Sequence, residues 1–148
     1  MVDPYLIEVA GERYALDRQY VEGVAEPEDL VALPRSPELL LGAAYWRGAF
    51  VPVVKTARLL GLPDDGAPRM LLMLAQGGRG AALAVEGAGG SSQPVEPPGG
   101  GLASGPAMGV VRLGGPESGE EAIWLDAERL LRECEQALNE RGGHPGQP

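Results

Sequence analysis

The stretch from Pro37 to Leu62 constrains most strongly how this chain can fold. It contains two short apolar runs, Leu39–Trp46 and Ala49–Val54, which are joined only by Arg47 and Gly48. Short runs that are rich in aliphatic and aromatic residues and bounded by Gly or Pro are typical of buried strands. A glycine suits a tight turn that needs an unusual backbone angle. The sequence therefore predicts a hairpin of two buried strands with an arginine at its tip.

The residues at the end of this hairpin predict how it continues. Pro52 has no backbone N–H, so we expect the second strand to lie at a sheet edge or to carry a bulge there. Thr56 is expected to cap a short helix, Ala57–Leu60, which Gly61 ends. The predicted unit is strand, turn, strand and short helix.

Strand-like runs on both sides of this unit indicate a chain that is mainly β-structure. The further expected strands are Tyr5–Ala10, Arg13–Leu16, the short piece Leu30–Leu33, Arg69–Ala75, Ala81–Glu86, Gly109–Leu113 and Ala122–Leu125. Between them, Gly87–Met108 shows no periodicity, although Gln93–Val95 and Leu102–Ala103 could pair weakly. Many short strands with little long helix favour a small barrel or sandwich.

Two helices are expected outside the central unit. Asp17–Val24 is predicted as a short helix, with Asp17 as its cap and Tyr20, Val21 and Val24 as its apolar side. A longer helix is expected after Asp126 and ends near Gly142. The apolar stripe expected on this helix consists of Leu130, Cys134 and Leu138, broadened by Ala127 and Leu131.

Composition excludes several classes of protein. The formal net charge of −9 argues against nucleic acid and against an anionic membrane as the main partner, because like charges repel. The longest purely apolar run, Met70–Ala75, is too short to span a bilayer, and the first residues lack the pattern of a signal peptide. A single cysteine, Cys134, excludes an internal disulfide framework and a cysteine-based zinc site. We therefore expect a soluble, cytoplasmic protein.

Candidate catalytic residues are few and poorly placed. His144 is the only histidine and lies in a Gly/Pro-rich tail that could not hold a base in position. Cys134 lies among leucines, where a core residue is far more common than a reactive thiol. The acidic pairs Asp64-Asp65 and Glu120-Glu121 lie in glycine-flanked turns and are better explained as solvated residues. No phosphate-binding fingerprint is present. We expect no enzyme, no cofactor and no metal; a small hydrolase that uses Asp64 or Asp65 is the alternative of another class.

The central hairpin resembles the CheW-like domain, the adaptor module of bacterial chemosensory arrays. The pattern is Pro37-x-x-x-x-Gly42, then Trp46-Arg47-Gly48, then Val51-Pro52-Val53-Val54. In the family these places hold a Pro, an apolar-x-Gly, a Leu-Arg-Gly and an apolar-Pro-apolar-apolar strand followed by Asp. The Tyr5–Leu16 hairpin and the segments GVVRL and AIWLDAERLL also fit in order and spacing. The resemblance covers about residues 4–87 and 109–135.

The resemblance implies two packed, small, five-stranded SH3-like β-barrels with a C-terminal helix and no catalytic site. It implies one domain over residues 1–141, with one subdomain around 17–87, another formed by 1–16 with 88–141, and a flexible tail over 142–148. Members of the family link methyl-accepting receptors to the CheA histidine kinase. The expected partners are therefore the cytoplasmic tip of such a receptor, the regulatory domain of a CheA-type kinase and other CheW-like proteins.

The resemblance also suggests a protein-binding surface. Its expected residues are Val21, Gly23, Val24, Trp46, Arg47 and Lys55. Arg47, Val21 and Gly23 match family positions implicated in receptor or kinase contact. The plain alternatives are an ordinary turn arginine for Arg47 and a core stripe for Val21 and Val24.

Three departures from the family pattern mark an atypical member. Lys55 replaces the usual acid after the Val-Pro strand, and Gly23 stands where a Glu is common. Gly87–Met108 is short of strand-forming residues, which leaves the completeness of the second barrel open. Two adaptor functions follow: a coupler of receptors to the kinase with weakened kinase contact, or a CheW-like scaffold in motility or pilus control that binds no kinase.

Overall fold

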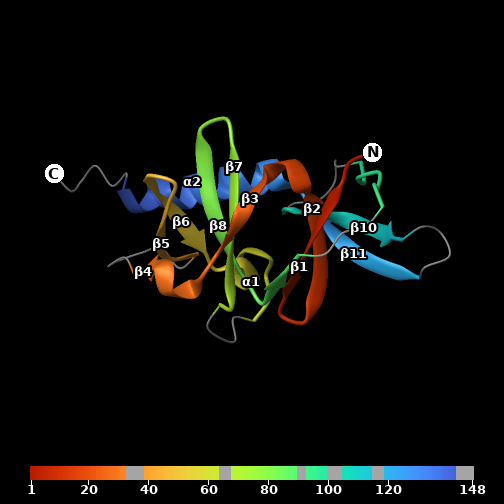
Figure 1. Ribbon diagram of the computed structural model, residues 1–148, viewed down its shortest axis with the longest axis horizontal. Helices are drawn as coiled ribbons and strands as arrows, with labels where there is room; N and C mark the ends of the chain where they lie inside the picture. The colour runs from red at the N-terminus through yellow and green to blue at the C-terminus, as the bar shows by residue number, and fades with distance from the viewer. Residues whose placement is uncertain (33–38, 64–67, 90–92, 100–104, 115–118, 143–148) are drawn as a thin grey trace.

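Two β-sheets and one long helix make up the part of the chain that the structure describes. The structure is a computed structural model, and it describes residues 1–32, 39–63, 68–89, 93–99, 105–114 and 119–142. The two sheets lie side by side, and the helix α2 (Ala127–Gly142) runs along the first sheet, behind β7 and β8 in the view of Figure 1. The mainly β character and the C-terminal helix predicted from the sequence are confirmed.

The first sheet has six strands in the order β3-β7-β8-β6-β5-β4. Their bounds are Val21–Ala25 (β3), Leu30–Val31 (β4), Leu40–Trp46 (β5), Ala49–Val54 (β6), Met70–Gln76 (β7) and Arg79–Val85 (β8). Neighbouring strands are antiparallel, except that β6 and β8 run parallel through Val53 and Val54. The hairpin predicted from the sequence, β5–β6, therefore lies inside this sheet.

The second sheet has five strands in the order β10-β11-β2-β1-β9. Their bounds are Pro4–Val9 (β1), Glu12–Asp17 (β2), Gly87–Ala88 (β9), Ala107–Leu113 (β10) and Glu120–Leu125 (β11). Its inner strands β11 and β2 run parallel. Each sheet thus consists of two hairpins joined through one parallel pair of inner strands. The second sheet adds the short strand β9 at one edge, whereas the first sheet adds β3 at one edge and β4 at the other.

Apolar side chains from both sheets and from α2 form the largest core. It contains Leu16 from β2, Leu83 from β8 and Leu130 from α2, each with no exposed surface. Leu131, Cys134 and Ala127 are buried in the same core, as the predicted stripe requires, and so is Ala137; the side chain of Leu138 lies outside the described residues. Asp126 Oδ1 accepts from the backbone N–H of Arg129 at 3.2 Å, which confirms its capping role.

Each sheet also has a smaller core on its other face. In the first sheet this core contains Ala44, Val53, Leu71 and Met73. In the second sheet the corresponding core is built around Trp124. The first sheet therefore buries apolar residues on both faces, which explains why β7 and β8 are almost wholly apolar in sequence.

The helix predicted over Asp17–Val24 is wrong beyond its first turn. Asp17 does cap a helix, with its Oδ1 accepting from the N–H of Gln19 at 3.0 Å, but this is a three-residue 3-10 turn, Arg18–Tyr20. The chain then enters β3, which pairs with β7. Its β-branched valines favour a strand once a partner is present, and a sequence window does not show that partner. A second 3-10 turn, Pro27–Asp29, leads into β4.

Two expectations about the end of the central hairpin also need correction. Helix α1 spans Thr56–Leu59, and Thr56 is not its cap: the buried hydroxyl donates to the carbonyl of Val54 at 3.5 Å, and Lys55 holds the cap position without a side-chain bond. Pro52 lies in an inner strand and not at an edge. The strand tolerates a proline because β6 pairs with β8 only through Val53 and Val54. Pro52 precedes these two residues and therefore has a neighbouring strand, β5, on one side only.

The segment Gly87–Met108 forms little regular pairing within its described parts. β9 pairs with β1 through two residues, and Val95 bridges to Val2. The weak pairing expected for Gln93–Val95 is therefore found at Val95. Residues 102–103 and the tail after Gly142 lie outside the described residues.

Candidate functional site

Three hairpins close with two-residue turns in which both residues have a positive φ. The turns are Ala10-Gly11 (51° and 81°), Arg47-Gly48 (48° and 89°) and Gly77-Gly78 (58° and 81°). This pair of angles is what a type I′ turn requires, and glycine adopts it without strain. Ala10 and Arg47 are non-glycine residues in this region, where a Cβ costs energy. Arg47 is therefore held in a strained backbone position at the tip of the predicted hairpin.

The Arg47 side chain is exposed but not free. Its exposed fraction is 64%, and Nη1 lies 3.5 Å from Oε2 of Glu22 on β3. The guanidinium carbon lies 5.2 Å from the centre of the Trp46 ring, within the range of a cation–π contact. An exposed ion pair stabilises a fold by only about 0–1 kcal/mol. These contacts consequently orient the arginine more than they stabilise the protein.

Glu22 is placed by an irregularity in β3. Val21 pairs with Leu74 and Gly23 with Met73, so Glu22 is one extra residue opposite a continuous partner strand. Such a β-bulge bends an edge strand and changes the direction of a side chain. Glu22 Oε1 accepts from Trp46 Nε1 at 3.2 Å, while Oε2 faces Arg47. One carboxylate thus holds two neighbouring residues of the hairpin tip.

Trp46 connects strands that are far apart in the order of the sheet. It lies on β5, near one edge, whereas Glu22 and Gly23 lie on β3 at the opposite edge. The ring covers Gly23 closely enough that a Cβ there would lie 3.0 Å from two of its carbons. The first sheet is therefore curled, with Trp46 joining its two ends. We call Glu22, Gly23, Trp46 and Arg47 the Arg47 cluster.

A groove of about 460 Å³ lies between the Arg47 turn and the Gly77-Gly78 turn. Val51 and Met73 are among its apolar lining residues, and both Arg47 and Arg79 line it as well. Gly80 allows the Val51 side chain to lie close to β8 at this groove, since a Cβ on residue 80 would lie 3.2 Å from Val51 Cγ1. The groove therefore combines apolar side chains with two arginines, a composition typical of a protein-binding surface.

Arg79 also ties the groove to α2. Its Nη2 donates to Glu128 Oε1 at 2.8 Å. This bond lowers the pKa of the Glu128 carboxyl, because the carboxylate is the form that accepts it. Tyr20 also bonds to Glu128, and burial together with nearby carboxylates raises the pKa of the Tyr20 phenol. The first turn of α2 is therefore fastened to the hairpin that forms one wall of the groove.

The structure brings together only some of the residues expected on a binding surface. Gly23, Trp46 and Arg47 meet in the Arg47 cluster. Val21 and Val24 pair with Leu74 and Leu72 and so share their face of the sheet, where Val21 packs on the largest core and Val24 is 42% exposed.

Lys55 lies at the other end of the hairpin. It follows β6, whereas Arg47 precedes it, and a six-residue strand is about 20 Å long. Lys55 therefore belongs to a different part of the surface, and its expected role in binding stays a prediction.

Sequence reasoning missed Glu22, Met73 and Arg79. Glu22 stood inside a segment predicted as helix, and its direction depends on a bulge that only pairing with β7 creates. Met73 and Arg79 reach the groove because β7 and β8 turn back beside β6. A local sequence pattern carries no signal for Met73 or Arg79. For Glu22 there was a weak signal, since an acidic residue next to Gly23 can pair with the Trp46-Arg47 turn.

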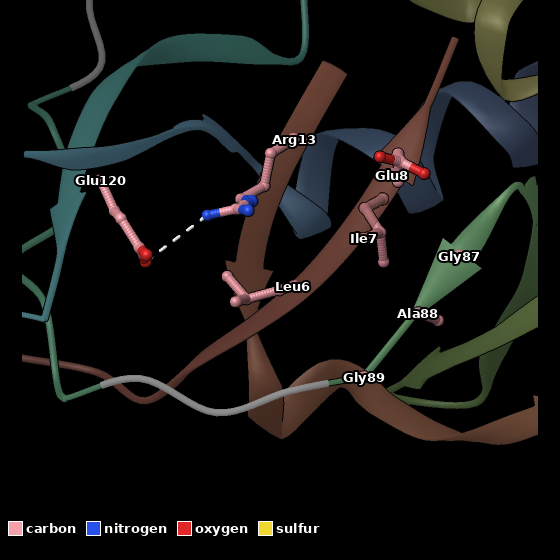
Figure 2. A pocket seen from close by; sticks show the side chains of 8 residues that line it. All are labelled: Leu6, Ile7, Glu8, Arg13, Gly87, Ala88, Gly89 and Glu120. Carbon is pink, nitrogen blue, oxygen red and sulfur yellow. Dashed lines mark ion pairs between the residues drawn. The ribbon is translucent and has the colours of Figure 1, made fainter. Parts of the chain in front are cut away.

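A second pocket, of about 400 Å³, lies on the second sheet and is shown in Figure 2. Arg13 and Glu120 point toward each other with 3.6 Å between Nη1 and Oε2, Leu6 lies below Arg13 in this view, and Gly87–Gly89 lies on the other side of the pocket. Both charged side chains are half or more exposed. This pocket contains none of the residues expected on the binding surface.

The structure describes some of the residues that the sequence offers as catalytic candidates. No group of three or more His, Cys, Asp or Glu residues among them is placed to hold a metal ion. Burial raises the pKa of the Cys134 thiol to about 12, so it stays protonated at neutral pH. Glu120 is engaged with Arg13. Asp64 and Asp65, on which the hydrolase alternative depends, and His144 lie outside the described residues.

Comparisons with known proteins bear on the family and the fold of the chain. None of the described helices is long and apolar enough to cross a membrane. A search of curated proteins finds no match. The crystal structure of the scaffolding protein TtCheW from Thermoanaerobacter tengcongensis is similar in fold, with a TM-score of 0.68 at 20% sequence identity over 84% of this chain and 88% of that one. The family model of the CheW-like domain matches residues 5–135. The chain therefore belongs to the CheW-like domain family and has its scaffold fold.

Proposed function

We propose that this protein is a non-enzymatic adaptor of a chemosensory system, which couples the cytoplasmic tips of methyl-accepting receptors to a CheA-type histidine kinase. It would act in the cytoplasm, where receptor tips and kinase meet. The single observation that carries the proposal is the Arg47 cluster. A strained arginine, held by Glu22 and Trp46, lies beside an apolar groove in a chain of the CheW-like family.

The strain at Arg47 supports a role in binding. A left-handed backbone costs a non-glycine residue about 1–2 kcal/mol. The exposed Glu22 pair offsets only a fraction of this. Gly77-Gly78 closes a neighbouring hairpin in the same type of turn without a side chain. The turn backbone therefore does not require an arginine, and the exposed Arg47 side chain, held by Glu22 and Trp46, is placed where a partner can reach it.

The groove beside Arg47 suggests the form of the receptor segment. Interface centres bury apolar and aromatic side chains, and arginine is enriched among the residues that carry most of the binding energy. Val51, together with Ala49 and Ala75, offers the apolar part, and Arg47 offers the polar anchor. A receptor helix that inserts one apolar side chain and presents a hydrogen-bond acceptor to Arg47 would fit this surface.

Contact with the kinase is the weaker half of the proposal. Gly23 has no side chain to offer, and Lys55 brings a positive charge where the family has an acid. We therefore expect binding to the kinase regulatory domain to be weaker than binding to the receptor. Receptor binding without any kinase binding would support the alternative, a scaffold in motility or pilus control.

The test is a titration of the purified protein with a receptor cytoplasmic fragment and, separately, with the kinase regulatory domain. We expect Arg47→Ala to weaken receptor binding about tenfold, which corresponds to about 1.4 kcal/mol. Unfolding in denaturant should change by less than about 0.5 kcal/mol, as is usual for exposed positions.

Arg13→Ala is the matched control. Arg13 is also an exposed arginine in an exposed ion pair, but it lies on the second sheet. It should leave receptor binding unchanged. If both substitutions weaken receptor binding equally, the effect is explained by the loss of one positive charge and not by the place of Arg47. An Arg47→Ala protein that binds the receptor as tightly as the wild type would refute the proposed surface.

A further inference from the structure

We infer that Gly23 and Trp46 form a coupled pair that positions Arg47: the indole ring occupies the space of a side chain at position 23, and the ring in that place sets where the guanidinium lies. Trp46 is therefore a positioning residue. The inference rests on the proposed function only for its effect on binding. Its geometric part concerns this chain alone.

The ring, and not the backbone, requires a glycine at position 23. The φ angle of Gly23 lies outside the left-handed region, so β3 could accept any L-residue there. A Cβ, however, would lie 3.0 Å from both Cη2 and Cζ2 of Trp46. Carbon atoms pack without strain at about 3.5–4.0 Å. A side chain at position 23 consequently requires the indole ring to shift by a few tenths of an ångström or more.

The ring is also fixed by its polar edge. Trp46 Nε1 donates to Glu22 Oε1 at 3.2 Å, and Arg47 lies both 5.2 Å from the ring centre and 3.5 Å from Glu22. These three contacts form a closed set, so a shift of the ring changes the bond to Glu22 and the stacking of Arg47 together. The bulge at Glu22 supplies the direction that this set needs.

Two incompatible surfaces follow from this crowding. With glycine at position 23, the ring lies over β3, and a partner meets an indole and a guanidinium. With a larger residue at position 23, the partner meets that side chain and a displaced ring. The pair therefore determines which of these surfaces the hairpin tip presents, and we expect it to contribute to partner choice.

Four proteins test the coupling: the wild type, Gly23→Ala, Trp46→Leu and the double variant. Unfolding in denaturant is measured for all four, and the indole N–H signal of Trp46 is followed by NMR in the two that retain the ring. Gly23→Ala should shift that signal and weaken receptor binding about tenfold, equivalent to about 1.4 kcal/mol. In the Trp46→Leu background the same substitution should cost nothing and should raise stability, because a strand accepts alanine better than glycine.

Gly87→Ala is the control, because Gly87 also lies in a strand without a left-handed φ but has only ordinary contacts at 3.8 Å. It should leave the Trp46 signal in place. An equal effect of Gly23→Ala in both backgrounds would overturn the inference. If Gly23→Ala alone fails to fold, the double variant must recover folding; failure of both would equally overturn it.

The outcome is separable from the proposed function. If the wild type binds no receptor fragment, the proposed function fails, whereas the stability cycle and the indole signal still decide whether the two residues are coupled. If the wild type binds the receptor fragment and the stability effects of Gly23→Ala and Trp46→Leu add up in the double variant, only the coupling of the two residues is refuted.

Discussion

Two hairpin turns of this protein share one backbone geometry and differ in what surrounds them. Ala10-Gly11 closes β1–β2 and Arg47-Gly48 closes β5–β6, each with two positive φ angles and a non-glycine residue first. At the first turn, both backbone N–H groups donate to the carboxylate of Glu86, at 2.9 and 3.1 Å. At the second turn, the contacts run through the Arg47 side chain to Glu22 and Trp46.

The difference shows that turn type alone does not indicate a role. The Glu86 carboxylate lies 76 residues from Ala10 in sequence and fastens the second sheet to the end of β8. That turn contributes to the assembly of the fold. The Arg47 turn instead holds a side chain at the surface next to a groove. The same turn conformation therefore helps to hold the two sheets together at Ala10-Gly11 and, in our proposal, presents a partner-binding side chain at Arg47-Gly48.

The largest effect should come from the carboxylate that holds the Ala10 turn. Glu86→Ala removes the acceptor of two backbone N–H groups, and a hydrogen bond to a charged group contributes about 1.5–3 kcal/mol. Because the site is partly exposed, we expect a loss of about 2 kcal/mol in the free energy of unfolding, measured in denaturant, with receptor binding unchanged. Glu12→Ala, an exposed acid on the strand beside this turn, is the control and should have little effect. If Glu86→Ala unfolds at the same denaturant concentration as the wild type, the Ala10 turn does not contribute to the assembly of the fold and the proposed difference between the two turns is wrong.

Relief of backbone strain should have a smaller effect at both turns. Glycine tolerates a positive φ, so Ala10→Gly should raise the free energy of unfolding by up to about 1 kcal/mol. Arg47→Gly should be more stable than Arg47→Ala by a similar amount, since only glycine relieves the strain. Receptor binding should survive Ala10→Gly and should be weakened equally, by about tenfold, in both Arg47 variants. Tighter binding by Arg47→Gly than by Arg47→Ala would show that the turn backbone, rather than the side chain, makes the contact.

The smallest effect concerns the groove wall that faces the Arg47 turn. Arg79 lowers the pKa of Glu128, so the folded state binds a proton there less readily than the unfolded state. This pair therefore stabilises the protein fully above the ordinary glutamate pKa of 4.5 and ceases to do so as the pH falls below it. In Arg79→Met, stability should decline less steeply below pH 4.5, as measured by denaturant unfolding at stepped pH. Arg13→Ala is the control for the lost charge, and an unchanged slope in Arg79→Met would contradict the assignment.

Local sequence patterns were sufficient for most of the fold. Apolar runs bounded by Gly and Pro predicted the strands of the three hairpins, because turn chemistry and alternation act within a few residues. They failed at Val21–Ala25, where two valines and a glycine pair with β7 and do not continue the turn that Asp17 caps. The spacing of Trp46, Arg47 and Gly48 was enough to single out the hairpin tip, yet not to say which other residues would reach it.

The sequence by itself determined that this chain forms short strands around apolar hairpins and that an arginine stands at the tip of one of them. Those features depend on the size of the side chains, on the backbone angles that each residue can adopt and on the spacing of apolar residues, all of which are determined within a few residues of sequence. Only the tertiary structure decided that Glu22 and Gly23 meet Trp46 and Arg47, because they come from opposite edges of one sheet. That meeting depends on the curl of the sheet and on one extra residue in β3, and pairing between distant strands produces both.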